Sequence, residues 1–307
     1  MPASSAELVR AARKAGLAVP AFNVPYLPMA EPIIRAVVDS DAVAFLEVAR
    51  LEWIKFEARG LAEALSEYRR YANPKHVRLH LDHVPVIDED GLLVDYLEVI
   101  QSAIALGYDS VMVDGSRLPL DENIAATRAV ADAAHAAGIP CEAELGAILG
   151  HESGPLPPYE ELFAAGKGFT RVDEAERFAR ESACDWLSVA AGNIHGAISA
   201  AFKDRKKDEA RLDLDHLGRL ADATGLPLVL HGGTGIKKEY LLGAIACGIA
   251  KVNVATEIRQ PYEVTLKETG DVRKAQEAVY ERTMGYLESY IELSGTRGRI
   301  CSAVAAA

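Results

Sequence analysis

The sequence predicts a (β/α)8 barrel, an α/β fold in which eight parallel strands alternate with helices. Short apolar runs alternate with helix-like segments along all 307 residues, and no low-complexity linker interrupts them. The runs are almost continuous in Val, Leu and Ile, which is typical of strands covered on both faces. Barrels of this kind use more than about 200 residues in one domain, so we expect a single domain over residues 1–307.

A doubly wound sheet is the alternative arrangement of alternating strands and helices. In that fold a GxGxxG turn often follows the first strand, whereas AFNVPYLP stands there in this chain. The sequence therefore favours the barrel, although periodicity alone leaves both arrangements open.

The expected strands are the short apolar runs, because runs of this length are typical of strands buried on both faces. We expect them at Ala18–Val24, Val43–Val48, Val77–Asp82, Ser110–Val113, Pro140–Leu145, Trp186–Ala190, Pro227–Leu230 and Lys251–Val254.

The expected helices separate these strands, and several end at a glycine, as helix C-termini prefer. The glycines in question are Gly107, Gly138, Gly225 and Gly248. We expect helices at Glu31–Asp39, Gly60–Tyr71, Leu92–Leu106, Leu120–Ala137, Val172–Glu181, Asp215–Thr224 and Lys238–Cys247, followed by a longer helical tail over Tyr262–Ser294.

One connection is unusually long. Between the fifth strand and Val172 the chain reads AILGHESGPLPPYEELFAAGKGFTR, which is rich in Gly and Pro. Compact domains seldom carry such a loop unless it acts as a lid or binds a ligand. A partly disordered surface insertion is the other interpretation, and both stay open.

Composition excludes several classes of function. The chain has 33 basic and 45 acidic residues and a net charge of −12, which weighs against nucleic acid or an anionic membrane as a partner. No apolar run reaches the roughly 18 residues that span a bilayer, and Met1–Arg13 lacks the pattern of a signal peptide. The four cysteines form no CxxC pair and are expected to be reduced and mostly buried, as in a cytoplasmic protein.

Three of the eight histidines, His83, His195 and His231, directly follow predicted strands. Barrel enzymes place their chemistry at the carboxyl ends of the strands. Three imidazoles converging there would fit a catalytic Zn²⁺ site that keeps one position open. A single histidine at a strand end is more often a hydrogen-bonded wall residue, and we expect that role of His80.

Carboxylates accompany these histidines. Asp82 adjoins His83, where it could move a proton while its neighbour holds an ion or simply orient an imidazole. Asp114 and Glu144 could form a second site for a divalent or monovalent cation, or make structural hydrogen bonds. Glu152 lies in the long loop, where a solvated surface position is the default expectation.

The segment LHGGTGI predicts a phosphate site. Gly232 and Gly233 allow backbone N–H groups to approach a phosphate closely, and Thr234 adds a hydroxyl before the next helix. Phosphate sites of barrels commonly form from the loops after strands 7 and 8. Those loops are His231–Gly235 and Asn253–Thr256 in this chain.

Several motifs together resemble the class II, metal-dependent ketose-bisphosphate aldolases, which include the fructose- and tagatose-bisphosphate enzymes. The matching stretches run in the family's order from Phe22 to Arg259: LHLDH, GYDSVMVDGSRLPLDENIAATRAVADAAHAAGIPCEAELG, GNIHG, LHGGTGI and KVNVATE. The resemblance implies a (β/α)8 barrel, a zinc ion and usually a dimer or tetramer.

The resemblance also assigns roles to residues. His83, His195 and His231 match the family's zinc ligands, and Asp82 matches its acid/base residue. The residues that match positions able to hold a second or displaced metal are Asp114 and Glu144. Glu152 falls where the family's mobile loop carries a proton-transferring Glu. With Asn23 at the end of the first strand, the expected substrate-binding residues are Gly196, Gly232, Gly233, Thr234, Asn253, Val254, Ala255, Thr256 and Arg259.

The implied reaction is reversible cleavage of a ketose phosphate into dihydroxyacetone phosphate and an aldehyde. Zinc would bind the C2 carbonyl and C3 hydroxyl oxygens and disperse the negative charge of the enediolate. Asp82 would take the proton of the C4 hydroxyl, and Glu152 would protonate the enediolate once the loop closes.

Four departures from the family pattern touch the substrate side and none touches the metal ligands. Ala255 replaces an Asp, Pro25-Tyr26 stands where a second Asn is common after strand 1, Ala49-Arg50 replaces a serine at the end of strand 2, and DGSR replaces the commoner DGSH. Arg259 could reach a second anion across a subunit contact or lie on a helix surface. We therefore expect weak or no cleavage of fructose 1,6-bisphosphate and better turnover of another ketose phosphate.

Two other classes of function remain as alternatives. A metal-dependent barrel hydrolase usually carries His-x-His on strand 1, where this chain has Ala21-Phe22-Asn23. A non-catalytic aldolase-like partner subunit would not need Asp82 and the three histidines, all of which are present. The sequence favours the aldolase.

Overall fold

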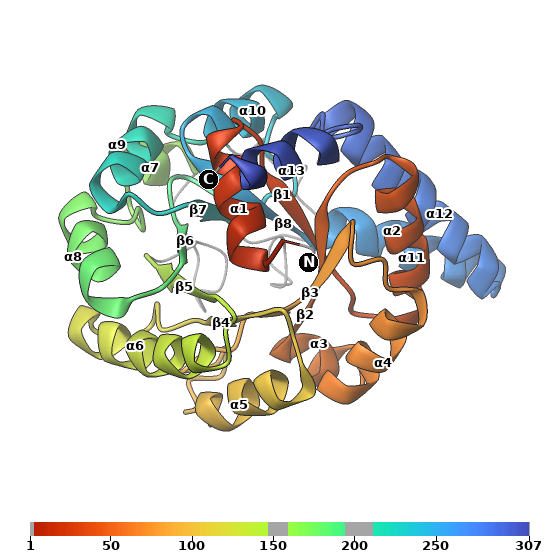
Figure 1. Ribbon diagram of the computed structural model, residues 1–307, viewed down its shortest axis with the longest axis horizontal. Coiled ribbons are helices and arrows are strands. Elements are labelled where there is room, and N and C mark those ends of the chain that lie inside the picture. The colour runs from red at the N-terminus through yellow and green to blue at the C-terminus, as the bar shows by residue number, and fades with distance from the viewer. Residues whose placement is uncertain (1–2, 147–158, 194–210, 307) are drawn as a thin grey trace.

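The structure is a computed structural model that describes residues 3–146, 159–193 and 211–306. Eight parallel strands close into a barrel in the order β1 to β8, with β8 pairing back to β1 (Figure 1). The predicted barrel is therefore confirmed, and the doubly wound sheet is excluded.

Each strand lies within two residues of its predicted limits, and all strand residues are buried. The largest difference is in the last strand, which begins at Ile249 because Ile249 already pairs with Leu228. The strands are β1 (Val19–Asn23), β2 (Ala44–Ala49), β3 (Val77–Asp82), β4 (Ser110–Val113), β5 (Cys141–Leu145), β6 (Trp186–Val189), β7 (Leu228–Leu230) and β8 (Ile249–Val254).

Helices surround the barrel on all sides (Figure 1). They are α1 (Ser5–Lys14), α2 (Ala30–Asp39), α3 (Arg50–Lys55), α4 (Leu61–Tyr71), α5 (Tyr96–Leu106), α6 (Leu120–Ala136), α7 (Tyr159–Ala164), α8 (Val172–Ser182), α9 (Leu214–Thr224), α10 (Lys238–Ala246), α11 (Thr256–Thr269), α12 (Val272–Gly285) and α13 (Arg297–Ala305), with short helices η1 (Leu27–Met29) and η3 (Tyr286–Tyr290).

Two predicted helices were placed wrongly. Helix α5 begins at Tyr96 rather than Leu92, because the Asp95 side chain caps it by accepting from the Glu98 N–H. The helical tail is not one run: Gly270 adopts a left-handed conformation that ends α11, and the Asp271 side chain then caps α12.

Among the described residues, four α-helices were not predicted: α1, α3, α7 and α13. Helix α1 carries a capping box between Ser4 and Glu7, a signal that was present in the sequence. Helix α7 lies inside the connection predicted as a loop, so that connection is not structureless throughout.

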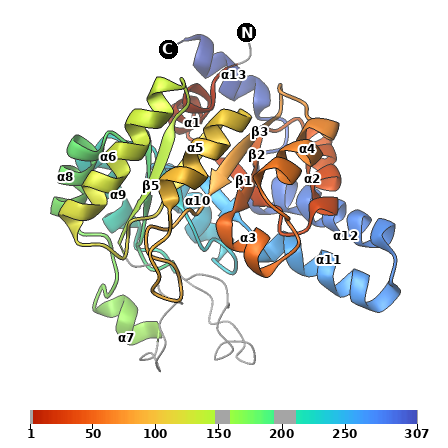
Figure 2. The same ribbon diagram turned by 90° about the horizontal axis from the view of Figure 1, so that it is seen from below.

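The two ends of the barrel differ. Helices α1 and α13 lie side by side at one end, and α7 projects at the opposite end, where the strands finish (Figure 2). The amino ends of the strands are therefore covered, and the carboxyl ends face the loops that carry the predicted site residues.

Strand side chains alternate between the barrel interior and the helix layer. Residues two positions apart therefore share the interior, as the polar pairs His80 with Asp82, Glu142 with Glu144, and Lys251 with Asn253 do. Trp186 fills the interior beside Phe45, with ring centroids 6.1 Å apart. These aromatic rings therefore pack beside the polar residues inside the barrel, where the Trp186 indole donates to Glu142.

Cys141 and Cys184 are buried, whereas Cys247 is half-buried and Cys301 is exposed, so only two of the four cysteines are buried as expected. Among the described residues, no helix combines the length and the apolar character needed to cross a membrane.

Candidate active site

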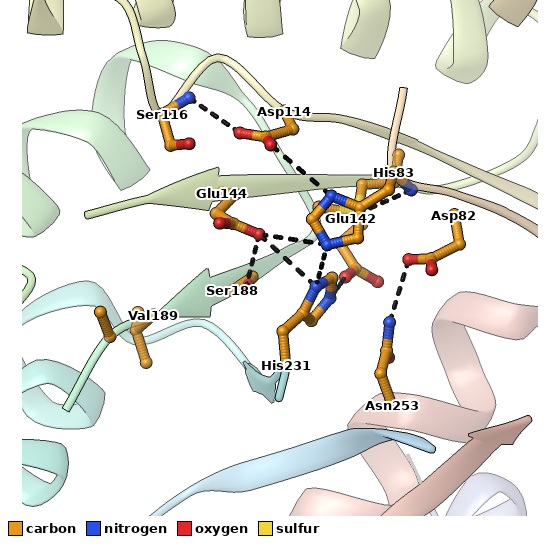
Figure 3. Close-up of polar contacts among 12 residues, drawn as sticks. Asp82, His83, Asp114, Ser116, Glu142, Glu144, Ser188, Val189, His231 and Asn253 are labelled. Atoms are coloured by element: carbon orange, nitrogen blue, oxygen red, sulfur yellow. Dashed lines mark hydrogen bonds and ion pairs between the residues drawn. The ribbon is translucent and has the colours of Figure 1, made fainter. Parts of the chain in front are cut away.

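The end of β3 places two site residues together. Asp82 is the last strand residue and lies opposite Ala49 of β2. His83 follows with a φ of 35°, in a region that few residues other than glycine adopt. Such strained backbone clusters at functional sites, and here the imidazole of His83 lies against that of His231 (Figure 3).

His231 directly follows β7 and is 1% exposed. Its Nδ1 lies 2.8 Å from Nε2 of His83, and its Nε2 lies 2.8 Å from Oε1 of Glu142. A carboxylate only accepts hydrogen bonds, so Nε2 of His231 carries the proton and Nδ1 offers a lone pair. The ring nitrogen that faces His83 is therefore the one whose lone pair could bind a cation.

Two further carboxylates surround the histidines (Figure 3). Oδ2 of Asp114 lies 3.5 Å from Nδ1 of His83. Oε2 of Glu144 lies 3.9 Å from Nε2 of His83 and 3.5 Å from Nδ1 of His231, and accepts from Ser188. The fold thus gathers four of the predicted residues from β3, β4, β5 and β7.

The electrostatics of the two histidines differ. Burial would lower the pKa of His83, but the carboxylates of Asp82, Asp114 and Glu144 raise it well above its usual range. Burial and a charged His83 together hold the pKa of His231 well below its usual range. The acids around His83 therefore favour a positive charge at this point.

The donor set fits a metal ion. The ligand atoms of Asp82, His83 and His231 all lie within 4.8 Å of one another, as do those of His83, Asp114 and Glu144. Nε2 of His83 and Nδ1 of His231 face each other at 2.8 Å, so the two rings would offer two nitrogen lone pairs to one cation once His83 has lost its extra proton. Nitrogen and carboxylate ligands together suit zinc and related divalent ions.

Asp82 is held between two amides. Nδ2 of Asn23 donates to Oδ2 and Nδ2 of Asn253 donates to Oδ1, each at 2.9 Å. Burial alone would raise the pKa of Asp82, but the positive charges of His83 and Lys251 lower it. Asp82 is therefore an ionised carboxylate that can accept a proton.

A buried ionic cluster lies beneath these residues. Nζ of Lys251 lies 2.9 Å from Glu142 and 3.2 Å from Glu47, and none of the three is exposed. Burial would lower the pKa of Lys251, but the carboxylates of Glu142 and Glu47 outweigh burial and raise it. No role was predicted for Glu142 or Lys251, although charged residues inside apolar strands are a signal of buried pairs.

The histidines and acids open onto a cavity of about 450 Å³. A Cβ on Gly233 would lie 3.3 Å from the carbonyl oxygen of Asn253, so the loops after β7 and β8 approach closely. Val254 is buried and does not line this cavity. The predicted substrate-binding residues that do line it are Asn23, Gly232, Gly233, Thr234, Asn253, Ala255, Thr256 and Arg259.

Three arginines also line the cavity. Nη1 of Arg50 lies 3.7 Å from the Asp88 carboxylate, and Nη1 of Arg117 donates to the Asp88 carbonyl at 2.8 Å. Arg259 pairs with Glu263 at 2.7 Å. Arg259 is thus part of its own chain's cavity wall.

Three predicted residues, His195, Gly196 and Glu152, lie outside the described residues. Their expected roles as third zinc ligand, substrate contact and proton donor stay predictions.

A closed parallel barrel with clustered histidines and acids at the carboxyl ends of its strands defines a barrel enzyme with a candidate metal site. The chain belongs to the class II fructose-bisphosphate aldolase family, because residues 3–299 match the family model "Fructose-bisphosphate aldolase class-II". This family is metal-dependent, and its members are carbon–carbon lyases. The protein is therefore a class II aldolase.

Individual relatives agree with this assignment. The chain is 35% identical over 285 residues to a fructose-bisphosphate aldolase of Streptococcus pneumoniae (strain TIGR4), covering 91% of this chain and 87% of the relative. The YdjI aldolase structure from Escherichia coli K12 superposes with a TM-score of 0.74 at 26% identity, covering 97% and 100% of the two chains. A putative fructose-1,6-bisphosphate aldolase structure from Coccidioides immitis superposes with a TM-score of 0.76 at 28% identity, covering 96% of this chain and 98% of that one.

Proposed function

We propose that this aldolase uses zinc to cleave a ketose phosphate or bisphosphate reversibly into dihydroxyacetone phosphate and an aldehyde. The observation that carries the proposal is the approach of His83 Nε2 to His231 Nδ1 at 2.8 Å, beside the ionised Asp82. His195 is expected to complete the ligand set. We further expect a cytoplasmic homodimer or homotetramer.

Zinc bound by these histidines would act as a Lewis acid for the negative charge that develops on the dihydroxyacetone phosphate half. Asp114 and Glu144 are near enough to His83 to support the ion or to hold a second cation, divalent or monovalent.

The chain's own residues supply the proton transfers. During cleavage Asp82 takes the proton of the C4 hydroxyl, the C4–O bond becomes a carbonyl, and the electron pair of the C3–C4 bond stays on C3. Asn23 and Asn253 keep the Asp82 carboxylate in place for this step. Glu152 is expected to deliver the proton to C3. In condensation each transfer runs in reverse.

The phosphate of the dihydroxyacetone half is expected to bind the Gly232–Thr234 and Asn253–Thr256 loops, which line the cavity except for Val254. Glycines there let backbone N–H groups reach phosphate oxygens.

The aldehyde half is expected to differ from glyceraldehyde 3-phosphate. Ala255 lines the cavity where the family usually has an Asp, and Arg50 lines it near His83, whose carbonyl accepts from the Arg50 N–H at 3.4 Å. Losing a negative group and gaining a positive one would favour a more anionic or differently shaped aldehyde.

A panel of ketose phosphates, with products identified by mass spectrometry, tests the proposal. The zinc-loaded protein should release dihydroxyacetone phosphate from at least one of them and cleave fructose 1,6-bisphosphate weakly. No dihydroxyacetone phosphate from any substrate would contradict the proposal. A kcat/KM for fructose 1,6-bisphosphate near ~10⁵ M⁻¹s⁻¹, with no better substrate, would contradict only the specificity.

A further inference from the structure

Lys251 is a buried cation that the proposed mechanism does not use. It lies on β8 with no exposed surface and has three oxygen partners inside the barrel. Its Nζ lies 2.6 Å from Oδ1 of Asn253, 2.9 Å from Glu142 and 3.2 Å from Glu47. Buried charges are costly unless they are paired, so this cluster calls for an explanation.

Asn253, the first partner of Lys251, also bonds the proposed base Asp82. Because Lys251 donates to Oδ1 of Asn253, the amide must present its Nδ2 to Asp82. This Nδ2 donates to Oδ1 of Asp82 at 2.9 Å. A flipped amide would place its oxygen against the carboxylate, and two acceptors repel. Lys251 therefore fixes the orientation in which Asn253 holds Asp82.

Glu142, the second partner of Lys251, also contacts the predicted metal ligand His231. Glu142 accepts from Lys251 and from the Trp186 indole at 2.7 Å on Oε2, and its Oε1 faces Nε2 of His231 at 2.8 Å. A carboxylate at this point keeps the proton of His231 on Nε2 and leaves Nδ1 for a cation. The Lys251 ammonium balances the charge of that carboxylate.

We propose that Lys251 is a positioning residue that fixes Asp82 through Asn253 and the ring of His231 through Glu142. It acts on both the base and the metal site without contacting the substrate. The inference rests on the proposed function, because it assumes that His231 binds a metal ion.

Lys251 is not placed to react with a carbonyl substrate. It does not line the cavity, and its ammonium is engaged by three oxygen atoms. Borohydride treatment in the presence of dihydroxyacetone phosphate should therefore give no adduct, and a covalent adduct on Lys251 would contradict the positioning role.

The test uses the full-length protein and Co²⁺, whose visible absorption reports its ligands. Lys251→Met removes the charge and keeps the length of the side chain. We expect its Kd for Co²⁺ to rise about 10- to 100-fold, the usual effect of losing a group that orients a ligand. We also expect kcat to fall by more than KM changes. An unchanged Kd and spectrum in the folded variant would overturn the inference.

A double-mutant cycle separates positioning from general damage. If Lys251 acts on the metal through Glu142, adding Lys251→Met to Glu142→Gln should raise the Kd for Co²⁺ little further. Full additivity of the two effects would contradict the proposed route. Arg78→Met is the control, because Arg78 is a buried cation on β3 that bonds the carbonyls of Ala3 and Val77 instead. It should lower stability and leave Co²⁺ binding as it is.

Co²⁺ binding by the wild-type protein distinguishes failure of the proposed function from failure of the inference about Lys251. Wild-type protein that binds no Co²⁺ would contradict the proposed function, whereas wild-type binding with an unaffected Lys251→Met would contradict only the inference. If Lys251→Met does not fold, Lys251→Met/Glu47→Gln also removes the carboxyl group that pairs with Lys251 and is measured in its place. Failure of both variants to fold would make Lys251 a structural residue and overturn the positioning role.

Discussion

His83 shows how a single backbone conformation makes the site. Its φ of 35° departs from the extended β3 strand, and its imidazole then meets His231 and the Asp114 carboxylate. The sequence predicted both histidines because each directly follows an apolar run. It could not predict that Glu142 directs the tautomer of His231, since that contact depends on which interior side chains of β5 and β7 meet.

The first prediction concerns the base. Asp82→Ala should lower turnover by about 10² to 10⁴, the usual contribution of general acid–base catalysis, while the bound metal stays near the wild-type amount. Turnover and metal content of the purified variant check this. Loss of metal in parallel with turnover would show instead that Asp82 helps to hold the ion, as its closeness to His83 and His231 permits.

A second prediction concerns Glu52, a buried residue of α3. Burial raises its pKa to about 8 from an ordinary value of 4.5, although the Ala49 N–H opposes the shift. Between these pH values the folded state keeps a proton that the unfolded state has released. The free energy of unfolding therefore decreases as pH rises through this interval.

Glu52→Gln removes this titration. The free energy of unfolding of the variant minus that of wild type should therefore be more positive at pH 8 than at pH 5, by about 1 kcal/mol or more. Thermal unfolding of the metal-free proteins at both pH values measures it. Glu268→Gln, at an exposed position of α11, serves as the control. The same difference between Glu52→Gln and wild type at both pH values would contradict the prediction.

At the scale of elements, the barrel strands were predictable because burial on both faces gives apolar runs with clear ends. The errors in helix boundaries fell where a single polar residue decides the boundary. Asp95 starts α5 four residues later than the apolar pattern suggested, and Asp271 restarts the tail as α12. Apolar periodicity does not record such caps.

Gly115, just after β4, gives a prediction at this scale. A Cβ there would overlap Oδ1 of Asn123, which is fully buried and donates through Nδ2 to the Glu144 carbonyl. Gly115→Ala should therefore destabilise the fold by about 1–3 kcal/mol, as overpacking does, and weaken metal binding through the shifted end of β5.

Thermal unfolding and Co²⁺ titration check the Gly115→Ala variant. The matched control is Gly218→Ala in α9, where an added Cβ meets nothing within 4 Å and alanine is the better helix former. Equal melting temperatures for wild type and Gly115→Ala would show that Asn123 yields without cost.

The connection after β5 gives another prediction at this scale. Glu152 lies outside the described residues, and its proposed role is to protonate the dihydroxyacetone phosphate half. Glu152→Ala should slow hydrogen exchange at that carbon more than it weakens substrate binding. Deuterium exchange followed by NMR measures the first effect and KM reports on the second. Unchanged exchange would return Glu152 to an ordinary surface position.

The two ends of the barrel differ in what they carry: helices cover one end, and the candidate active site lies at the other. Helices α1 and α13 cover the amino ends of the strands, while the carboxyl ends carry the acids, histidines and glycine loops around the cavity (Figure 2). The fold and its catalytic end could be predicted because a barrel places its strand ends together. The ionic cluster below the site could not, because it needs the closed register of β2, β5 and β8.

Hydrogen–deuterium exchange of dihydroxyacetone phosphate in D₂O tests the metal-dependent aldolase account most directly. It requires neither the aldehyde nor knowledge of the natural substrate. The purified protein should catalyse exchange at the carbon that becomes C3, lose this activity when its metal is removed by a chelator, and regain it when Zn²⁺ is added. Full exchange by the metal-free protein in the presence of chelator would contradict the account.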